Sequence, residues 1–459
     1  MTWTGTATGT GTGTGTWWAE YAWLGGERTA EGVLLGVKDG AFSSVTPGVA
    51  VAPPGAATLR GITVPGFVNA HSHAFHRALR GRTQDKRGTF WSWRETMYQA
   101  AESLDPDLYL SLARAVFAEM LLAGYTTVGE FHYLHHDRGG RPYADPNQMG
   151  AALIEAATQA GIRMTLIDAC YLKGGFGDAP VDGVQLRFSD GDAARWAERV
   201  SGLKPAGNQR LAAAVHSVRA VEPEAIEHIA AFASHRGWPL HAHVAEQAAE
   251  VEDCRAASGR TPVELLGSSG ALHPGFTAVH ATRADPNDVV LLGDARAHVC
   301  ACPTTERDLG DGVGPFAQLR DVGVGLCVGS DSHAVVDGFE EARALEMNCR
   351  LLSGQRAVFS PSELLGSATA EGMAALGWPD GGLATGHPAD FVTFRADTAR
   401  TAGCDPSLAA CAVFAASAAD VDSVVVAGVP VVASGAHLRV EDPAAELGAA
   451  VRRVWEWRR

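Results

Sequence analysis

Short apolar runs alternate with amphipathic stretches through the middle of the chain, from about residue 61 to 384. The runs are ITVPGFVNA, TTVGEFH, IRMTLIDAC, LAAAVHS, PLHAHVA, FTAVHA, HVCACP and VGLCVGSDS. Helical spacing separates them, for example over 107–123, 147–160, 222–235 and 338–353. Strands that alternate with helices form parallel sheets, and eight such units predict a (β/α)8 barrel of TIM type. An open doubly wound sheet is the alternative, but GFVNAHSH is not the glycine fingerprint that such sheets usually carry.

The segments outside this region have other patterns. Residues 1–16 alternate Thr with Gly, which predicts a flexible tail. β-type patterns over 17–60 reappear only over 385–435, so we expect the two segments to pair into one small β-sandwich domain. This division leaves 61–384 as the barrel and 436–459 as a C-terminal helix.

Composition and charge narrow the classes of partner. Of the 459 residues, 46% are hydrophobic and 19% charged, which is typical of a globular chain. The net charge of −15 repels phosphate backbones, and no Lys/Arg cluster reverses it locally, so a nucleic-acid partner is not expected. No run of about 18 apolar residues or basic-then-apolar leader is present, so no membrane partner is expected.

Cysteine usage bears on the compartment and on one possible metal pair. The chain has eight cysteines, several of them within apolar runs, which predicts reduced, buried thiols and a cytosolic location. Cys300 and Cys302 could be mistaken for a soft metal pair. They lack a second pair at suitable spacing, so we interpret them as core residues.

Polar side chains stand where several apolar runs end. His71 and His73 follow the first run, His243 the fifth and Asp331 the eighth, and in a barrel these ends converge on one mouth. Residues two apart on a strand share a face, whereas His241 faces the other way from His243. Three imidazoles and a carboxylate with room for water suit one catalytic Zn2+, although Fe2+ or Mn2+ could occupy such a site. The simpler alternative for the first pair is two satisfied polar residues at a strand exit.

Two arginines indicate the class of substrate. Arg94 lies between aromatic residues in FWSWRETMY, and Arg219 follows the fourth apolar run. A guanidinium group binds a carboxylate through paired hydrogen bonds, so two of them match a substrate with two acid groups. An uncharged nucleobase would have little use for them. Surface ion pairs are the alternative role for each arginine.

The motifs PGFVNAHSHAFHRA, HAHVAEQ, AVHAT and VGSDSH together resemble the amidohydrolase superfamily over about residues 20–435. Two-metal members carry a lysine at the end of strand four, and AAAVHSVRAV has none, so the resemblance implies one metal. The spacing from His243 to Glu246 is similar to that of the deaminase and deiminase branch. Replacing nitrogen at a C=N carbon requires a group that moves protons. The simpler alternative for Glu246 is a solvated residue that opens a helix.

A closer resemblance is carried by HSHAF-x-RA, FWSWRE-x-MY, EFHY-x-HH, H-S-x-R-A-V, CPTTE-x-x-LGDG and SDSH, which in this order are similar to the N-formimino-L-glutamate iminohydrolase family. The resemblance implies hydrolysis of N-formimino-L-glutamate to N-formyl-L-glutamate and ammonia in histidine degradation, with one zinc ion. It also makes a homodimer the expected assembly. The implied roles are metal ligation by His71, His73, His243 and Asp331, catalysis by Glu246, His280 and Asp331, and substrate contact by Arg94, Tyr133, His216, Arg219 and His76.

His76 departs from that family, whose members commonly have glutamine at this position. An imidazole can donate or accept a hydrogen bond, and its charge ordinarily changes near neutral pH, which would alter substrate preference. Two other functions stay open at this point. One is an aminohydrolase of an aromatic heterocycle of guanine or triazine type, and the other is a non-catalytic barrel scaffold.

Overall fold

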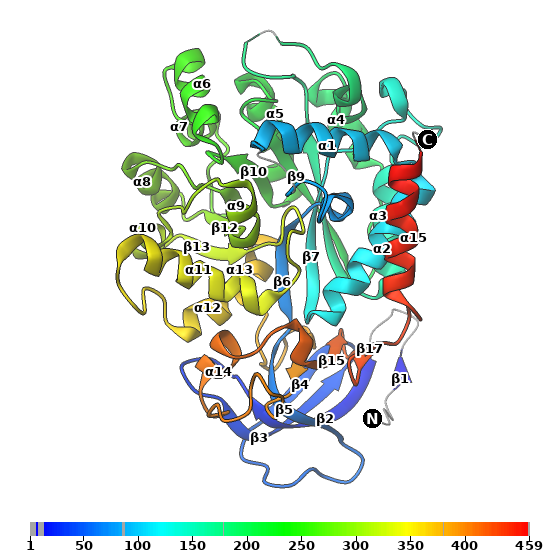
Figure 1. Ribbon diagram of the computed structural model, residues 1–459, viewed down its shortest axis with the longest axis vertical. Helices are drawn as coiled ribbons and strands as arrows, with labels where there is room; N and C mark the ends of the chain where they lie inside the picture. Colours follow the sequence, from blue (N-terminus) through cyan, green and yellow to red (C-terminus); the bar gives the residue numbers. More distant parts are fainter. Residues whose placement is uncertain (1–5, 8–12, 85–87, 178, 380, 458–459) are drawn as a thin grey trace.

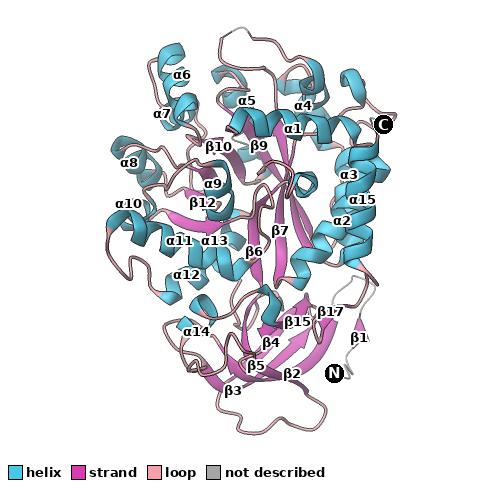
Figure 2. Ribbon diagram, in the orientation of Figure 1, coloured by secondary structure: helices cyan, strands magenta, loops and turns pink. Residues whose placement is uncertain are grey.

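The computed structural model describes residues 6–7, 13–84, 88–177, 179–379 and 381–457, and one of its two sheets is a parallel eight-stranded barrel (Figures 1 and 2). Its eight strands follow one another around the sheet in chain order. Most of their residues are buried, as expected for strands covered on both faces. The α/β barrel predicted from the alternating pattern is confirmed. The strands are β6 (Phe67–Ser72), β7 (Tyr125–His132), β8 (Arg163–Cys170), β9 (Gln209–Ser217), β10 (Leu240–Val244), β11 (Phe276–His280), β12 (His298–Ala301) and β13 (Gly325–Val328).

Helices connect the barrel strands, and the four ranges predicted from the sequence are confirmed to within one residue at each end. Caps explain the boundaries: α2 begins behind Asp105, whose carboxylate accepts the N–H of Leu108, and α11 begins behind Asp337. Among the described residues, no helix has both the length and the apolar character needed to cross a bilayer. The helices are α1 (Phe90–Ser103), α2 (Pro106–Leu122), α3 (Gln148–Ala160), α4 (Ala193–Ser201), α5 (Pro223–Arg236), α6 (Ala248–Ser258), α7 (Pro262–Ser268), α8 (Pro286–Asp294), α9 (Pro303–Leu309), α10 (Phe316–Asp321), α11 (Gly338–Ser353), α12 (Pro361–Ser367) and α13 (Ala370–Ala375).

The first and last barrel strands meet through a short seam, an isolated bridge between Ser72 and Asp331 instead of a regular ladder. The N–H of Asp331 donates to the carbonyl of His71 at 3.0 Å, and the N–H of His73 donates to the carbonyl of Asp331 at 3.2 Å. Below these contacts, the side-chain amide of Asn69 donates to the Ser330 hydroxyl at 2.7 Å and its oxygen accepts the Ser330 N–H at 2.9 Å. The seam therefore fixes the register of β6 against the segment that follows β13.

A second, nine-stranded sheet lies beside one end of the barrel and combines both ends of the chain (Figure 1). The joint is the antiparallel pairing of β5 with β14, in which Pro65 lies opposite Phe391. The predicted pairing of the terminal segments is thus seen directly. The strands are β1 (Thr6–Ala7), β2 (Gly13–Ala22), β3 (Ala30–Lys38), β4 (Ala41–Thr46), β5 (Ala57–Pro65), β14 (Phe391–Phe394), β15 (Val421–Val426), β16 (Val429–Ala433) and β17 (Ala436–His437), with α14 (Ala409–Phe414) between β14 and β15.

The tail predicted for residues 1–16 is wrong for its last four residues, which begin β2. Gly15 lies opposite Val37 in that pairing. The β-branched threonines favour an extended backbone, and Gly13 allows close packing, since a Cβ there would lie 2.1 Å from the carbonyl oxygen of Gly428. The remaining predicted tail residues lie outside the described residues, apart from β1.

Two further boundaries differ from the sequence-based ones. The run ITVPGFVNA is not one barrel strand: β5 ends at Pro65 in the small sheet and β6 begins at Phe67 in the barrel. The chain changes sheets at Gly66, where a Cβ would lie 2.1 Å from the hydroxyl of Thr126. The C-terminal helix expected from residue 436 is α15 (Pro443–Glu456), because β17 precedes it and Asp442 caps its first turn. In Figure 1, α15 runs alongside α2.

A buried ion pair joins the two sheets. Arg163, at the start of β8, donates from Nε to Asp390 Oδ2 at 2.6 Å and from Nη2 to Oδ1 at 3.1 Å. Asp390 Oδ1 also accepts the N–H of Ala427 at 2.6 Å. The guanidinium groups of Arg163 and of the exposed Arg210 lie 4.5 and 4.3 Å from the ring centroid of Trp378.

We expect Arg163→Met to lower the free energy of unfolding by about 3–5 kcal/mol, because it leaves the Asp390 carboxylate buried and without its cation. Arg210→Met is the matched control: it removes the other stacked cation but strands no buried charge, and should cost about 1 kcal/mol or less. Urea denaturation of both variants measures the difference. Equal losses would contradict the role given to the ion pair.

Candidate active site

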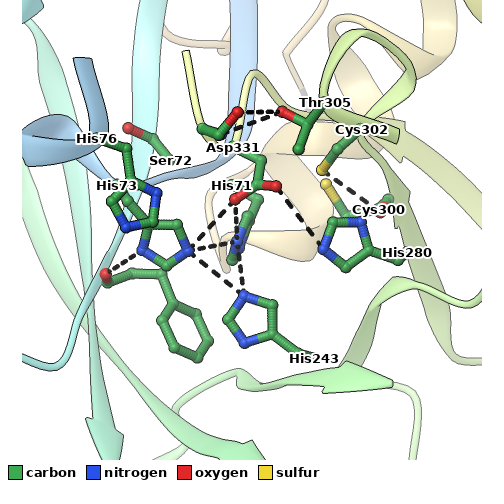
Figure 3. Close-up of polar contacts among 12 residues, drawn as sticks. His71, Ser72, His73, His76, His243, His280, Cys300, Cys302, Thr305 and Asp331 are labelled. Carbon is green, nitrogen blue, oxygen red and sulfur yellow. Dashed lines mark hydrogen bonds and ion pairs between the residues drawn. The ribbon is translucent and has the colours of Figure 1, made fainter. Parts of the chain in front are cut away.

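Four side chains from three parts of the barrel meet at the carboxyl ends of the strands (Figure 3). His71 and His73 come from the end of β6, His243 from β10 and Asp331 from the segment after β13. The Nε2 atoms of the three imidazoles lie 3.1, 3.2 and 3.4 Å apart. Asp331 Oδ1 lies 3.5 Å from Nε2 of His71 and 3.4 Å from that of His73. The sequence-predicted ligand atoms therefore surround one point.

The hydrogen bonds made by Nδ1 of two of these imidazoles determine which kind of ion the Nε2 atoms can bind. Nδ1 of His73 donates to the carbonyl of Phe131, and Nδ1 of His243 donates to the carbonyl of His216, each at 2.9 Å. A carbonyl only accepts, so both Nε2 atoms present lone pairs. Burial lowers the pKa of both rings, which keeps them neutral. Facing lone pairs together with the Asp331 carboxylate fit a divalent metal ion with an open coordination position.

Next to this cluster, His280 lies among three carboxylates. Its Nε2 is 3.8 Å from Asp331 Oδ2 and 3.9 Å from Glu246 Oε1, and its Nδ1 is 3.4 Å from Glu306 Oε1. Burial alone would lower the pKa of His280, but these carboxylates raise it to about 10. Burial alone would raise the pKa of Asp331, but His71 and His280 hold it below the usual range of a carboxyl group. The ring of His280 is therefore held as a cation, and the Asp331 carboxyl group beside it is held ionised.

Glu246 lies next to His280, with its Oε1 3.9 Å from Nε2 of that ring. Burial raises its pKa to about 7, although His280 and Arg219 act to lower it. A carboxyl group with a pKa near neutrality can both give and accept a proton at physiological pH. The alternative of a solvated helix-opening residue does not hold, since Glu246 is 5% exposed.

Two residues of the site have strained backbones. His280 has φ of 72° and Asp331 has φ of 41°, a region that non-glycine residues rarely adopt. For Asp331, the seam hydrogen bonds to His71 and His73 hold this conformation. Such strain is concentrated at sites where side chains must be aimed.

A pocket with an empty volume of about 590 Å3 opens above these residues. The five side chains that the family resemblance assigned to substrate contact all line it, together with aromatic rings that sequence reasoning did not single out. The predicted residues are Arg94, Tyr133, His216, Arg219 and His76, and the added rings are Phe90, Trp93, Tyr98, Tyr171 and Phe188.

The two pocket arginines differ in their surroundings. Arg94 lies 4.4 Å from the ring centroid of Trp91 and 5.5 Å from that of Tyr98, and no carboxylate among the described residues forms an ion pair with it. Arg219 is mostly buried, with Nε 3.7 Å from Glu250 Oε1. Neither arginine forms the surface ion pair that was the alternative role for it.

The expectation that His76 changes charge near neutral pH is corrected by its environment. Burial lowers the pKa of His76 to about 3, so the ring is neutral at physiological pH. Its Nε2 lies 2.9 Å from the hydroxyl of Tyr133. A neutral imidazole here can serve as a hydrogen-bonding group, as an amide would.

Sequence reasoning missed two carboxylates of the site. Glu306 lies in the CPTTE motif, which contributed to the resemblance without a role, and it accepts the N–H of Cys302 at 2.8 Å beside His280. Glu250 lies in the first turn of α6, four positions after Glu246, but Glu246 precedes that helix, so helical spacing does not indicate the contact.

Two other clusters have structural explanations. Asp168, close to His132 and His135, accepts two hydrogen bonds from the guanidinium of Arg199 at 2.8 and 3.0 Å, so a cation already occupies that cluster. All eight cysteines are free and seven are buried. Cys300 and Cys302 belong to a small hydrophobic core.

Residues 62–431 match the amidohydrolase family, to which the chain therefore belongs. It is an enzyme of the class that hydrolyses C–N bonds in substrates other than peptides. The family assignment agrees with the barrel and with the cluster of possible metal ligands at the carboxyl ends of its strands.

Among individual proteins, the chain is 38% identical to formimidoylglutamate deiminase from Pseudomonas aeruginosa, over 90% of this chain and 91% of that protein. A crystal structure of an amidohydrolase from Brucella melitensis superposes with a TM-score of 0.88 at 33% identity, covering 96% of this chain and all of that one. An adenosine deaminase from Xanthomonas campestris, solved with bound zinc, shares the fold with a TM-score of 0.80 at 22% identity, over 96% and 97% of the two chains.

We expect His243→Asn to lower metal affinity by more than the roughly 10–100-fold typical of an outer-shell substitution. The asparagine amide can keep the hydrogen bond to the His216 carbonyl but cannot replace Nε2. His241→Gln is the matched control on the same strand, because the glutamine amide can keep the bond to the Ala375 carbonyl that His241 Nε2 makes at 3.1 Å. Elemental analysis after dialysis measures both variants. Equal metal loss in the two would contradict the ligand assignment.

Proposed function

We propose that this enzyme is a zinc-dependent deiminase that hydrolyses N-formimino-L-glutamate to N-formyl-L-glutamate and ammonia, the reaction of histidine degradation. The observation that carries the proposal is the presence of two guanidinium groups, Arg94 and Arg219, in one pocket with the metal-type cluster. The similarity to the Pseudomonas aeruginosa deiminase supports the same substrate. A homodimer and a cytosolic location stay predictions.

We infer that His71, His73, His243 and Asp331 hold one Zn2+, a site that could also take Fe2+ or Mn2+. When bound, the ion would supply a Lewis acid that makes hydroxide available from water near neutral pH. Closed structural zinc sites use four protein ligands, often thiolates, whereas a set of imidazoles and one carboxylate is typical of catalytic sites.

The protein's own groups supply the proton transfers. Asp331 accepts the proton of the attacking water, and the cationic His280 stabilises the negative charge that develops at the attacking oxygen. Glu246 then protonates the imine nitrogen. Collapse of the adduct breaks the bond to that nitrogen, which takes the second water proton and leaves as ammonia, while the formamide remains. The proton held on Asp331 then passes to Glu246, so that over a full cycle one water provides every atom that the products gain.

The other pocket residues position the substrate. Arg94 and Arg219 bind the two carboxylates, which are remote from the formimino carbon, so these residues act by placing that carbon rather than by reacting. Tyr133, His216 and the neutral His76 supply hydrogen bonds along the remaining wall.

An ammonia-release screen of the metal-loaded enzyme tests the proposal. We expect release from N-formimino-L-glutamate and none from guanine or an aminotriazine, because the two guanidinium groups of the pocket match a dicarboxylate and have no partner on an uncharged ring. Release from the heterocycles alone would establish the aromatic aminohydrolase instead. A purified protein that binds no metal and releases no ammonia from any compound would indicate a scaffold.

We expect Glu246→Gln to cut kcat by about 10²–10⁴-fold, the usual contribution of general acid–base assistance, while metal content stays at the wild-type level. The amide keeps the size of the side chain but cannot exchange a proton. Steady-state ammonia release and elemental analysis of the same preparation give both quantities. Wild-type turnover in this variant would remove Glu246 from the mechanism.

We expect Arg219→Met to weaken substrate binding by about 2–5 kcal/mol, the cost of breaking a desolvated charge pair. KM should rise with a smaller change in kcat, since the guanidinium does not contact the reacting carbon. Arg210→Met, an exposed arginine at the opposite end of strand β9, serves as control and should leave both constants unchanged. An unchanged KM in Arg219→Met would exclude the clamp.

A further inference from the structure

Glu250 lies behind the pocket wall and contacts two parts of the site at once. Its Oε2 accepts the backbone N–H of Glu246 at 3.0 Å. Its Oε1 lies 3.7 Å from Nε of Arg219. The residue is 2% exposed, and neither Oε1 nor Arg219 Nε has a hydrogen-bond partner among the described residues. A carboxylate buried this deeply is costly unless a cation pairs with it. The Arg219 guanidinium is the cation that lowers this cost for Glu250.

Arg219 is held at one edge only. Glu250 faces Nε, while the terminal nitrogens have no ion-pair partner in the described part of the chain, and the side chain lines the pocket. Phe90 is the aromatic neighbour, with its ring centroid 5.9 Å from the guanidinium carbon. A planar guanidinium with its Nε edge taken presents its remaining nitrogens to a carboxylate as a fork.

We propose that Glu250 is a positioning residue that sets the orientation of Arg219 for a substrate carboxylate. Through the N–H of Glu246, the same side chain also fixes the distance between the carboxylate-binding group and the proton-transferring group. The inference rests on the proposed function for the class of ligand, an acyclic dicarboxylate. It goes beyond that function by making substrate affinity depend on a residue that does not contact substrate.

Glu250→Gln separates the two contacts, because the amide oxygen can still accept the Glu246 N–H while the charge opposite Arg219 is lost. We expect the affinity for glutarate, an unreactive dicarboxylate measured by calorimetry, to fall about 10-fold, the size of a typical coupling between contacting residues. KM for N-formimino-L-glutamate should rise similarly with a smaller change in kcat. Glu250→Asp keeps the charge and should restore part of the affinity. Glu252→Gln, an exposed residue of the same helix, should change nothing.

A double-substitution cycle distinguishes positioning from a general structural effect. In the Arg219→Met background, Glu250→Gln should change kcat/KM by less than about 2-fold, because there is no guanidinium left to orient. A loss of the same size in both backgrounds would show a structural role and overturn the inference. If the single variant Glu250→Gln binds glutarate as tightly as the wild type or more tightly, the inference is also overturned. Tighter binding would show that Glu250 competes with the ligand for Arg219.

The outcome is separable from that of the proposed function. If Glu250→Gln weakens glutarate binding but the wild-type enzyme releases no ammonia from N-formimino-L-glutamate, the positioning role stands and the proposed substrate fails. In that case the cycle is completed with glutarate affinity in place of kcat/KM. If the wild type turns over N-formimino-L-glutamate and Glu250→Gln binds glutarate normally, the proposed function stands and the positioning role fails.

Discussion

The seam that joins β6 to the segment after β13 is the constraint on which the site depends. Asn69 and Ser330 are 261 positions apart in the chain, yet their side chains and backbone are paired by two hydrogen bonds. One step further along, the backbone of Asp331 bonds to those of His71 and His73. The hydrogen bonds that bring the first and last strands together are thus the same ones that place the carboxylate beside the two histidines.

Burial gives this cluster its chemical character. In water the three imidazoles would titrate near neutral pH, but desolvation lowers the pKa of His71, His73 and His243 and so keeps their lone pairs available. The carbonyls of Phe131 and His216 select the tautomer by accepting only from Nδ1. A cation is the species that facing lone pairs stabilise most, so the folded barrel is preorganised for a metal ion.

Burial and neighbouring charges also give the acidic residues of the site different pKa values. Around His280, one carboxyl group is held ionised by its neighbours while another has its pKa raised to about 7. Asp331 can therefore accept a proton while Glu246 can both donate and accept one. Next to Glu246, Arg219 and Glu250 form a charge pair, which allows a charged side chain to line a pocket that also contains many aromatic rings.

The sequence by itself determined the barrel, because eight apolar runs and the helices between them follow from local periodicity. It also indicated the candidate metal ligands and Arg219, since these residues stand at or just past the ends of the runs, whereas Arg94 was indicated by the aromatic segment that forms α1. Only the tertiary structure decided the rest. The change of sheets at Gly66 depends on the nearby hydroxyl of Thr126, and the strand at 13–16 depends on pairing with β3. The neutrality of His76 and the contact of Glu250 with Arg219 arise from burial and from the meeting of distant segments, which no local pattern encodes.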